Sequence, residues 1–418
     1  MSAPDAYAAA LQLHGNGRLE QAEAAYRAAL AQIPANAPQR PEMLRNYGFL
    51  LHQRHRFREA VAILSEAVKG LPQDVNAWSA LGQCARELGD HGKAMAAFQA
   101  AAKLAPERED VLAALSGYLS RAIPAWHLRM LADTARNDAY EQAISRAAAN
   151  SALTLDIGTG SGLLAMLAAR HGAKSVVACE AHPIIADTAT EIVALNGLQD
   201  RIRVVAKRST ELRPETDMGN AKADLIVSEI LDAGLLGEGV LATLRDALAR
   251  LATPAARVIP GRAEMFIQAI ALPGLRPAYP VRQISGFDLS PFDRFRNRAG
   301  HATHRLDHVD YQALSAPLQV ARIDFAAPPD WSQPVRDKIA LPITAEGPLQ
   351  AFALWFDLWL DDHVCVTTAP ASEANGRPNM PHWGQAILWQ MQDRAVQAGE
   401  TLSLIRELAD TYIDIRQA

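Results

Sequence analysis

The first third of the chain repeats itself, which limits it to folds built by stacking one unit. Two units of 34 residues begin at Pro41 and Val75, and an earlier, partial unit begins at Ala3. Small residues recur at positions 8, 20 and 27 of the two full units, bulky residues recur at positions 4, 7 and 24, and a proline follows at position 32. Small residues allow helices to approach closely, and proline ends a helix. The pattern therefore predicts stacked pairs of antiparallel helices.

This pattern resembles the tetratricopeptide repeat. A further helix over about 110–123 would close the stack. Repeats of this kind usually present a groove to a peptide, so the resemblance implies a protein partner, with a structural or assembly role as the alternative. The arginine-rich stretch Arg40–Arg58 is expected to be a solvated helix face, and an acidic partner for it is the alternative.

Composition limits the remaining function classes. A chain of 418 residues should hold about three domains. No apolar run is long enough for a membrane span, and the N-terminus lacks the pattern of a signal peptide. The net charge of -5 does not favour nucleic acid, and the three cysteines have neither disulfide nor metal spacing. We expect a reduced, cytoplasmic protein that binds no metal, membrane or nucleic acid.

The middle of the chain alternates between strands and helices. Strands are expected over 153–157, 175–179, 202–205 and 225–227, and a helical run is expected over 163–171. This alternation predicts a parallel sheet with helices on both faces, as in a Rossmann-like α/β domain.

A glycine-rich turn follows the first of these strands. It contains Asp156, Gly158, Gly160 and Gly162, and Glu180 ends the next strand. Glycines let the backbone turn and approach a ligand, and a glutamate at that strand end can accept both ribose hydroxyls. The spacing differs from the dinucleotide fingerprint, which leaves NAD as the weaker alternative, and there is no phosphate-binding lysine. The motif resembles the class I methyltransferases and so implies S-adenosyl-L-methionine as the cofactor.

Two glutamates lie nine residues apart after the strand 225–227. Glu229 and Glu238 are separated by glycines, in a loop at the end of a strand where open α/β sheets bind ligands. A guanidinium is planar and always charged, so two carboxylates can hold it on two edges. The alternative is an exposed loop with two solvated acids.

Together these motifs resemble the protein arginine N-methyltransferase family over about 123–392. The branch with tetratricopeptide repeats is most similar, through Trp126–Leu131. The resemblance implies that Glu229 and Glu238 bind the acceptor guanidinium of a protein substrate. It leaves the product open between mono-, symmetric and asymmetric dimethylarginine, with a preference for the first two.

The resemblance assigns further roles residue by residue. Met130 would contact the acceptor, and Arg136 would bind the donor's carboxylate. His382 would pair with Asp133, either to relay a proton or to order its loop. Trp383 would wall the arginine channel, with a plain core role as the alternative. Thr210 and Glu211 would lie beside adenine.

In the last third of the chain, apolar and polar residues alternate as they do in strands. Runs over 263–270, 318–325 and 349–358 predict strands. The resemblance implies that these strands form the family's β-barrel, with Ser285–Ser290 similar to a segment in its middle. The region 278–301 corresponds to the arm through which family members dimerise, so a homodimer is expected.

The predicted fold is therefore multidomain. All-α repeats occupy 1–122, the Rossmann-like methyltransferase domain 123–259 and the β-barrel 260–418. The leading hypothesis is a protein arginine methyltransferase. The alternatives are a class I methyltransferase with another acceptor and a non-catalytic scaffold built on the repeats.

Overall fold

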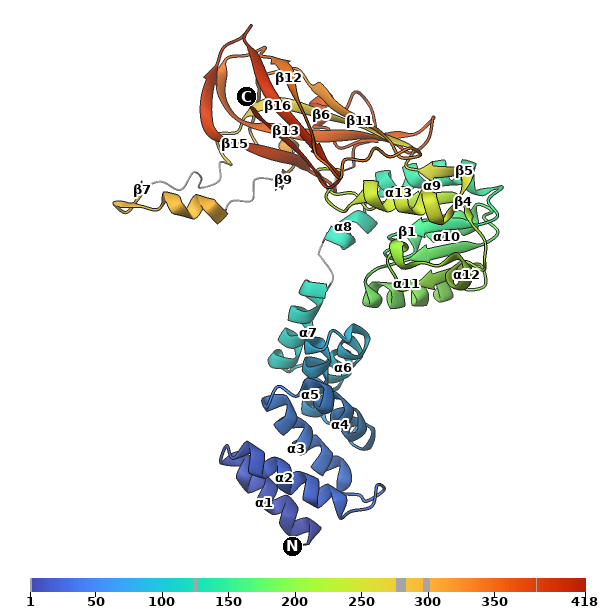
Figure 1. Cartoon of the computed structure of the whole chain (residues 1–418), viewed down its shortest axis with the longest axis vertical. Helices are drawn as coiled ribbons and strands as arrows, with labels where there is room; N and C mark the ends of the chain where they lie inside the picture. The colour runs from blue at the N-terminus through green and yellow to red at the C-terminus, as the bar shows by residue number, and fades with distance from the viewer. Residues whose placement is uncertain (1, 123–125, 276–282, 296–300, 381) are drawn as a thin grey trace. The chain divides into compact units, whose positions relative to one another are not determined.

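The computed structural model describes residues 2–122, 126–275, 283–295, 301–380 and 382–418 (Figure 1). Its contacts divide the chain into two compact units, Met1–Ala125 and Trp126–Ala418. The second and third predicted domains lie together in the second unit, so the division at 259/260 stays a prediction. None of the described helices has the length and apolarity needed to cross a membrane.

Helical hairpins form the first unit, which confirms the predicted repeats. The helices are α1 (Ala3–Gly15), α2 (Leu19–Ala31), α3 (Arg40–Gln53), α4 (Phe57–Gly70), α5 (Val75–Glu87), α6 (His91–Leu104) and α7 (Glu109–Ala122). A Cβ added to Gly48 would lie 2.5 Å from Leu64, and one added to Gly82 would lie 2.8 Å from Phe98. Small residues therefore allow the paired helices to meet, as the spacing predicts. The expected closing helix is α7, and the last residue predicted for it, Ile123, lies outside the described residues.

The expectation for the arginine-rich stretch is wrong. Four of its five arginines are partly buried and pair with acids of the same unit, so their charges join neighbouring helices instead of facing solvent. The pairs are Arg40–Glu66, Arg45–Asp74, Arg54–Glu23 and Arg56–Glu23. A sequence run cannot show this, because the acids lie about 26 to 33 residues away on other helices.

A five-stranded parallel sheet opens the second unit, in the order β3-β2-β1-β4-β5. The chain order reverses between β1 and β4, and ligands bind at such switch points. The strands are β1 (Thr154–Ile157), β2 (Val176–Cys179), β3 (Ile202–Val205), β4 (Ala223–Ser228) and β5 (Ala252–Ile259). The helices are α8 (Trp126–Leu131), α9 (Thr134–Ala148), α10 (Leu163–Arg170), α11 (Pro183–Leu195), α12 (Pro214–Asp217) and α13 (Val240–Arg250), with η1 (Ser209–Glu211).

Antiparallel sheets fill the rest of the second unit. One has the order β10-β6-β13-β15-β9, with β11 on β6 and β14 on β13, and a second has the order β12-β16-β17. One hydrophobic cluster contains Leu155 of β1, Phe356 of β13 and Ile415 of β17, so the parallel and antiparallel parts share a core. The strands are β6 (Arg262–Ala271), β9 (Ala302–His304), β10 (Gln312–Ala313), β11 (Leu318–Asp324), β12 (Val335–Pro342), β13 (Gly347–Trp359), β14 (Cys365–Thr367), β15 (Gln385–Val396), β16 (Thr401–Ala409) and β17 (Tyr412–Gln417).

The placement of Ser285–Ser290 in the middle of a barrel is wrong. Among the described residues, strands β7 (Gln283–Ile284) and β8 (Phe287–Asp288) pair only with each other, and η2 (Ser290–Phe295) follows. Phe287 is 70% exposed and Phe292 is 66% exposed. The other parts of the predicted arm, 278–282 and 296–300, lie outside the described residues.

Candidate active site

The glycine turn lies at the switch point of the parallel sheet, directly after β1. Gly158, Gly160 and Gly162 have φ values of +74°, +56° and +83°. Residues other than glycine rarely adopt this backbone conformation. A Cβ on Gly158 would lie 2.5 Å from Ile230, whereas the space beside Gly160 is open. The turn therefore requires glycine, and at Gly160 it leaves room for a ligand to approach the backbone.

Two acids brace this turn from the strands. Glu180 follows β2 and accepts hydrogen bonds from the backbone N–H of Gly160 at 3.1 Å and of His182 at 2.8 Å. Asp156 is buried in β1 and accepts a hydrogen bond from Thr159 at 2.6 Å. Burial raises the pKa of Asp156 to about 6, although the Thr159 hydrogen bond opposes the shift. The predicted cofactor residues on these two strands are therefore adjacent.

The other predicted cofactor residues occupy η1, after β3. Thr210 and Glu211 are both exposed, and Glu211 accepts a hydrogen bond from the backbone N–H of Arg208 at 3.1 Å. Their role beside adenine stays a prediction.

We call residues 229–239, which follow β4, the acceptor loop. Its first glutamate, Glu229, has only 4% of its side chain exposed. One carboxylate oxygen lies 2.7 Å from Arg136 Nη2, and the other lies 3.7 Å from His382 Nε2. The residue assigned to the donor, Arg136, thus contacts the residue assigned to the acceptor. Arg136 also lies over the Tyr140 ring, 4.9 Å from its centre.

Asp133 joins the start of α9 to the segment before β15. Its carboxylate accepts hydrogen bonds from the Arg136 backbone N–H at 3.0 Å and from His382 Nδ1 at 2.7 Å. The expected contact between His382 and Asp133 is therefore present. Met130 is buried at the end of α8, three residues before Asp133. Asp133, His382, Glu229 and Arg136 form one buried cluster of charges, which we call the Glu229 cluster.

The Glu229 cluster shifts the pKa values of its members. Burial alone would lower the pKa of His382, but the hydrogen bond to Asp133 and the negative charges of Glu229 and Asp133 outweigh it and raise the pKa. Burial alone would raise the pKa of Asp133, but the hydrogen bonds from His382 and from the Arg136 backbone lower it. The cluster therefore favours an imidazolium between two carboxylates.

Glu238, at the other end of the acceptor loop, has the opposite environment. Water reaches the residue, yet the surrounding protein removes part of its hydration, and this is the main reason that the pKa of Glu238 rises to about 7. The negative charges of Glu229, Asp232 and Glu180 raise it further. Like charges at close range disfavour ionisation, and a cation would favour it.

Trp383 holds the acceptor loop in place. Its Nε1 donates a hydrogen bond to the Leu231 carbonyl at 3.0 Å, and its ring packs edge-on against Phe356 with centres 5.5 Å apart. The side chain is almost fully buried. Trp383 therefore connects the loop to the antiparallel core, while its predicted role in walling the channel stays a prediction.

Comparisons with known proteins match every part of this architecture. Residues 50–109 match a tetratricopeptide repeat model, and residues 139–260 match the model for ribosomal protein L11 methyltransferase. Residues 261–417 match the arginine methyltransferase oligomerization subdomain.

An arginine N(omega)-methyltransferase of Streptomyces achromogenes subsp. streptozoticus is 37% identical over 286 residues, which are 68% of this chain and 76% of that protein. The chain belongs to the protein arginine N-methyltransferase family. Members of this family depend on S-adenosylmethionine. Mouse protein arginine N-methyltransferase 9 is 27% identical over 88% of this chain, but the chain spans only 46% of that relative's length.

A solved structure of the same family supports the fold. The Trypanosoma brucei PRMT1 enzyme-prozyme heterotetrameric complex with AdoHcy has a TM-score of 0.59 and 25% identity, and the match covers 71% of this chain and 93% of that one. The unmatched share is about the size of the repeats, so the likeness concerns the methyltransferase part.

In this family member, the structure pairs His382 with Asp133, as the resemblance implies, whereas the contacts of Glu229 with Arg136 and His382 were not predicted. Three further residues of the site escaped prediction, namely Tyr140, Asp232 and His301. Tyr140 follows Arg136 by one helical turn, and Asp232 lies between the two glutamates. These spacings could have indicated that both residues lie at the site. His301 lies 69 residues beyond Asp232, and nothing in the sequence links the two. Among the described residues, no group of three or more potential metal ligands occurs.

The Glu229 cluster predicts a pH-dependent contribution to stability. Folding raises the pKa of His382 above 6.5. Protonated His382 therefore contributes its full stabilisation to the folded state below pH 6.5, and this contribution is lost as the pH rises through the pKa of the folded state. The difference in unfolding free energy between the wild type and His382→Gln should therefore shrink from about pH 6 to about pH 9 in urea titrations. Asp133→Asn should weaken the same pH dependence, because only the Glu229 carboxylate would then raise the pKa of His382. A difference that stays constant over this range would contradict the assignment.

Proposed function

We propose that this protein transfers a methyl group from S-adenosylmethionine to the guanidinium of an arginine in a protein substrate. The observation that carries the proposal is the pair Glu229 and Glu238 on one loop at the switch point, one carboxylate compensated and the other crowded by negative charge. A guanidinium would offset the negative charges that raise the pKa of Glu238, and its two edges suit two carboxylates. Family membership supports the same conclusion.

The cofactor would bind across the glycine turn. The open side of Gly160 lets the cofactor approach the backbone, and Glu180, which already contacts the turn, is placed to accept the ribose hydroxyls. Arg136 would bind the cofactor's carboxylate, and Thr210 and Glu211 would contact adenine. When bound, the cofactor supplies an electrophilic methyl group on a sulfonium. The residues of the turn therefore fit S-adenosylmethionine. The turn has no phosphate-binding lysine, which a nucleotide phosphate would call for.

The two glutamates would act on the acceptor nitrogen. Glu229 and Glu238 hold the guanidinium on two edges and draw its positive charge toward them, which leaves more electron density on the remaining nitrogen. That nitrogen would take the methyl group from the sulfonium, which would leave as a neutral thioether, and its surplus proton would pass to the water that reaches Glu238. Fixed carboxylates that face the reacting group lower the barrier because they need no reorganisation during the reaction.

We assign His382 and Asp133 to positioning. The raised pKa of His382 favours the form that already carries a proton, and this form cannot accept the proton that the product releases. As an imidazolium it donates to Asp133 and faces Glu229, and it fixes the rotamer of that carboxylate. Of the two roles that the resemblance left open, the structure thus supports ordering. Met130 and Trp383 would border the acceptor.

The acceptor pair gives a direct test. Glu238→Gln and Glu229→Gln should each lower kcat for methyl transfer to arginine-containing peptides by about 100-fold or more, because one fixed charge on the guanidinium is lost. Glu238→Gln should still bind S-adenosylmethionine in calorimetry, because Glu238 is not placed at the cofactor. Radiolabelled methyl incorporation and mass spectrometry would measure the products.

Glu215→Gln is the matched control, since Glu215 is an exposed acid of α12 in the same domain. Full activity in both acceptor variants would refute the mechanism. Methyl groups found on another residue type would instead support the alternative of a class I methyltransferase with a different acceptor. No binding of S-adenosylmethionine by the wild type would support the non-catalytic scaffold.

The raised pKa of Glu238 predicts the pH profile. Below about pH 7 the carboxyl is largely protonated and cannot pair with the guanidinium, so kcat/KM should rise with pH and level off above about 7. Asp232→Asn removes one of the charges that raise this pKa, so it should move the midpoint to lower pH. If the wild type and Asp232→Asn have the same midpoint, Glu238 does not control the rise of kcat/KM with pH.

We further infer that the protein forms a homodimer through the hairpin and η2. Exposed apolar side chains gather there: Ile284, Phe287, Leu289 and Phe292. The antiparallel region also matches a model described as an oligomerization subdomain. Sedimentation of the full chain should show a dimer, and replacing Phe287 and Phe292 by serine should give monomers. Leu11→Ser, at an exposed leucine of α1, is the control. A monomeric wild type would refute the inference.

We also propose that the tetratricopeptide repeats bind a protein partner. Their charges are largely used within the stack, so the partner is not expected to be strongly acidic.

A further inference from the structure

We propose that His301 is a positioning residue that holds Asp232 and thereby sets the place of Glu238. The inference rests on the proposed function, because it assumes that the acceptor loop receives the substrate. Neither the glycine turn nor the Glu229 cluster contains His301.

The two ends of the acceptor loop are held differently. The first end is fixed by Arg136, His382 and Trp383, which contact Glu229 and the Leu231 carbonyl. The second end carries Glu238 and follows the buried side chains of Leu235 and Leu236. Between them, the Asp232 carboxylate accepts a hydrogen bond from the Gly237 backbone N–H at 2.9 Å. The orientation of Asp232 therefore determines where the backbone places Glu238.

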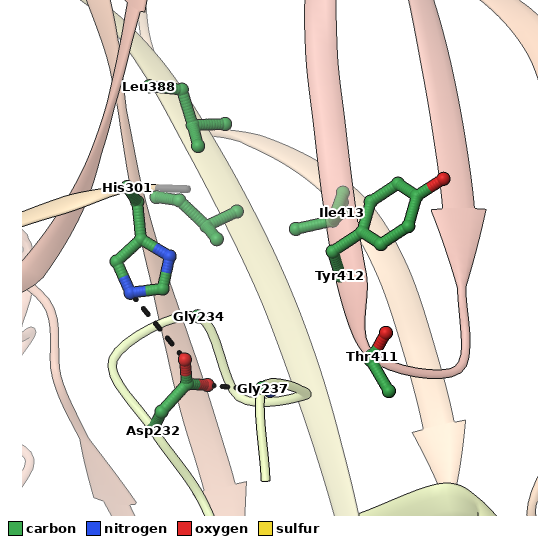
Figure 2. Close-up of a pocket in the computed structure, with 9 residues that line it drawn as sticks. Asp232, Gly234, Gly237, His301, Leu388, Thr411, Tyr412 and Ile413 are labelled. Carbon is green, nitrogen blue, oxygen red and sulfur yellow. Dashed lines mark hydrogen bonds and ion pairs between the residues drawn. The ribbon is translucent and has the colours of Figure 1, made fainter. Parts of the chain in front are cut away.

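His301 holds the other side of that carboxylate. Its Nε2 lies 3.6 Å from the Asp232 Oδ2, and Figure 2 shows both contacts of Asp232. A Cβ on Gly234 would lie 2.8 Å from the His301 ring, and one on Gly237 would lie 2.3 Å from Asp232 Oδ2. Both glycines are thus needed for the loop, the carboxylate and the imidazole to fit together. Such close fitting is typical of a built contact and not of two surface charges.

Packing alone does not hold this end of the loop. Asp232, Gly234, Gly237 and His301 line a pocket of about 230 Å³, whose other walls include Leu388 and Thr411 (Figure 2). Open space on one side of a loop removes the dispersion contacts that would otherwise resist its movement. The polar contact between His301 and Asp232, both of which line this pocket, is therefore a restraint on the loop in addition to the packing of Leu235 and Leu236.

His301 is itself fixed to the other half of the site. It precedes β9, in which His304 pairs with Gln385 and Thr303 pairs with Ala386 of β15. A Cβ on Gly384 would lie 2.7 Å from the His304 carbonyl oxygen, so the backbones are in close contact just after Trp383. The contact from His301 to Asp232 thus sets Glu238 relative to the segment that carries His382 and Trp383.

The test combines kinetics with hydrogen exchange on the full-length protein. His301→Ala should lower kcat/KM for an arginine-containing peptide about tenfold, because small displacements of a positioned group are costly. In the Asp232→Asn background the same change should cost less than threefold, since both act through one contact. The Gly237 amide should exchange about tenfold faster in His301→Ala, while the Gly160 amide keeps its wild-type rate.

His301→Gln separates positioning from general loss of structure. The glutamine amide can donate to Asp232 at similar reach, so it should restore most of the activity and the Gly237 protection. His308→Ala, an exposed histidine of the same segment, is the matched control. Equal losses in both backgrounds, or unchanged Gly237 exchange, would overturn the proposal. If the wild type methylates no arginine, the proposed function fails, and the exchange result still decides whether His301 positions the loop.

Discussion

The site depends on the buried charges around Glu229. The cluster joins three segments far apart in sequence, which supply Asp133 and Arg136, Glu229, and His382. Burying an ion costs several kcal/mol unless partners replace its hydration, so each member needs the others. With His382 protonated, two cations face two carboxylates and the cluster is neutral. This requirement explains why the pKa of His382 rises and why α9, the acceptor loop and the segment before β15 hold one relative arrangement.

This compensation at one end of the loop produces the asymmetry on which the chemistry rests. Glu229 already has partners on both oxygens, whereas the charges that raise the pKa of Glu238, those of Glu229, Asp232 and Glu180, are negative. The unbalanced charge is therefore concentrated at the residue that water reaches. In the proposed function, an incoming guanidinium would relieve the repulsion there without breaking the buried pairs. The crowding of carboxylates would then both bind and orient the acceptor.

Local backbone requirements made much of the site predictable from sequence. The glycine turn needs φ values that only glycine adopts readily, and Asp156 and Glu180 are fixed to it by strand ends, so their adjacency follows from spacing. Strands β1 to β4 appear within two residues of their expected bounds. Contacts set by long-range register were not predictable from the residues alone, and the contact of His382 with Asp133 was expected only through the family resemblance. The pairing of Glu23 with Arg54 and Arg56, the separate hairpin at Ser285–Ser290, and the approach of His301 to Asp232 all depend on which distant segments become neighbours. No periodicity records that choice.

The boundaries of the parallel domain explain why the fold alone does not define the acceptor. Residues 139–260 match a model for a methyltransferase with a different named substrate, and they contain both Glu229 and Glu238. Yet the partners that orient Glu229 lie outside this range: Asp133 and Arg136 precede it, and His382 follows it. The parallel sheet can place two carboxylates on a loop, but only the flanking helix and the antiparallel sheet make one of them fixed and compensated. Under the proposed function, specificity for a guanidinium would therefore arise at the junction between these parts, which share the hydrophobic core that contains Leu155, Phe356 and Ile415.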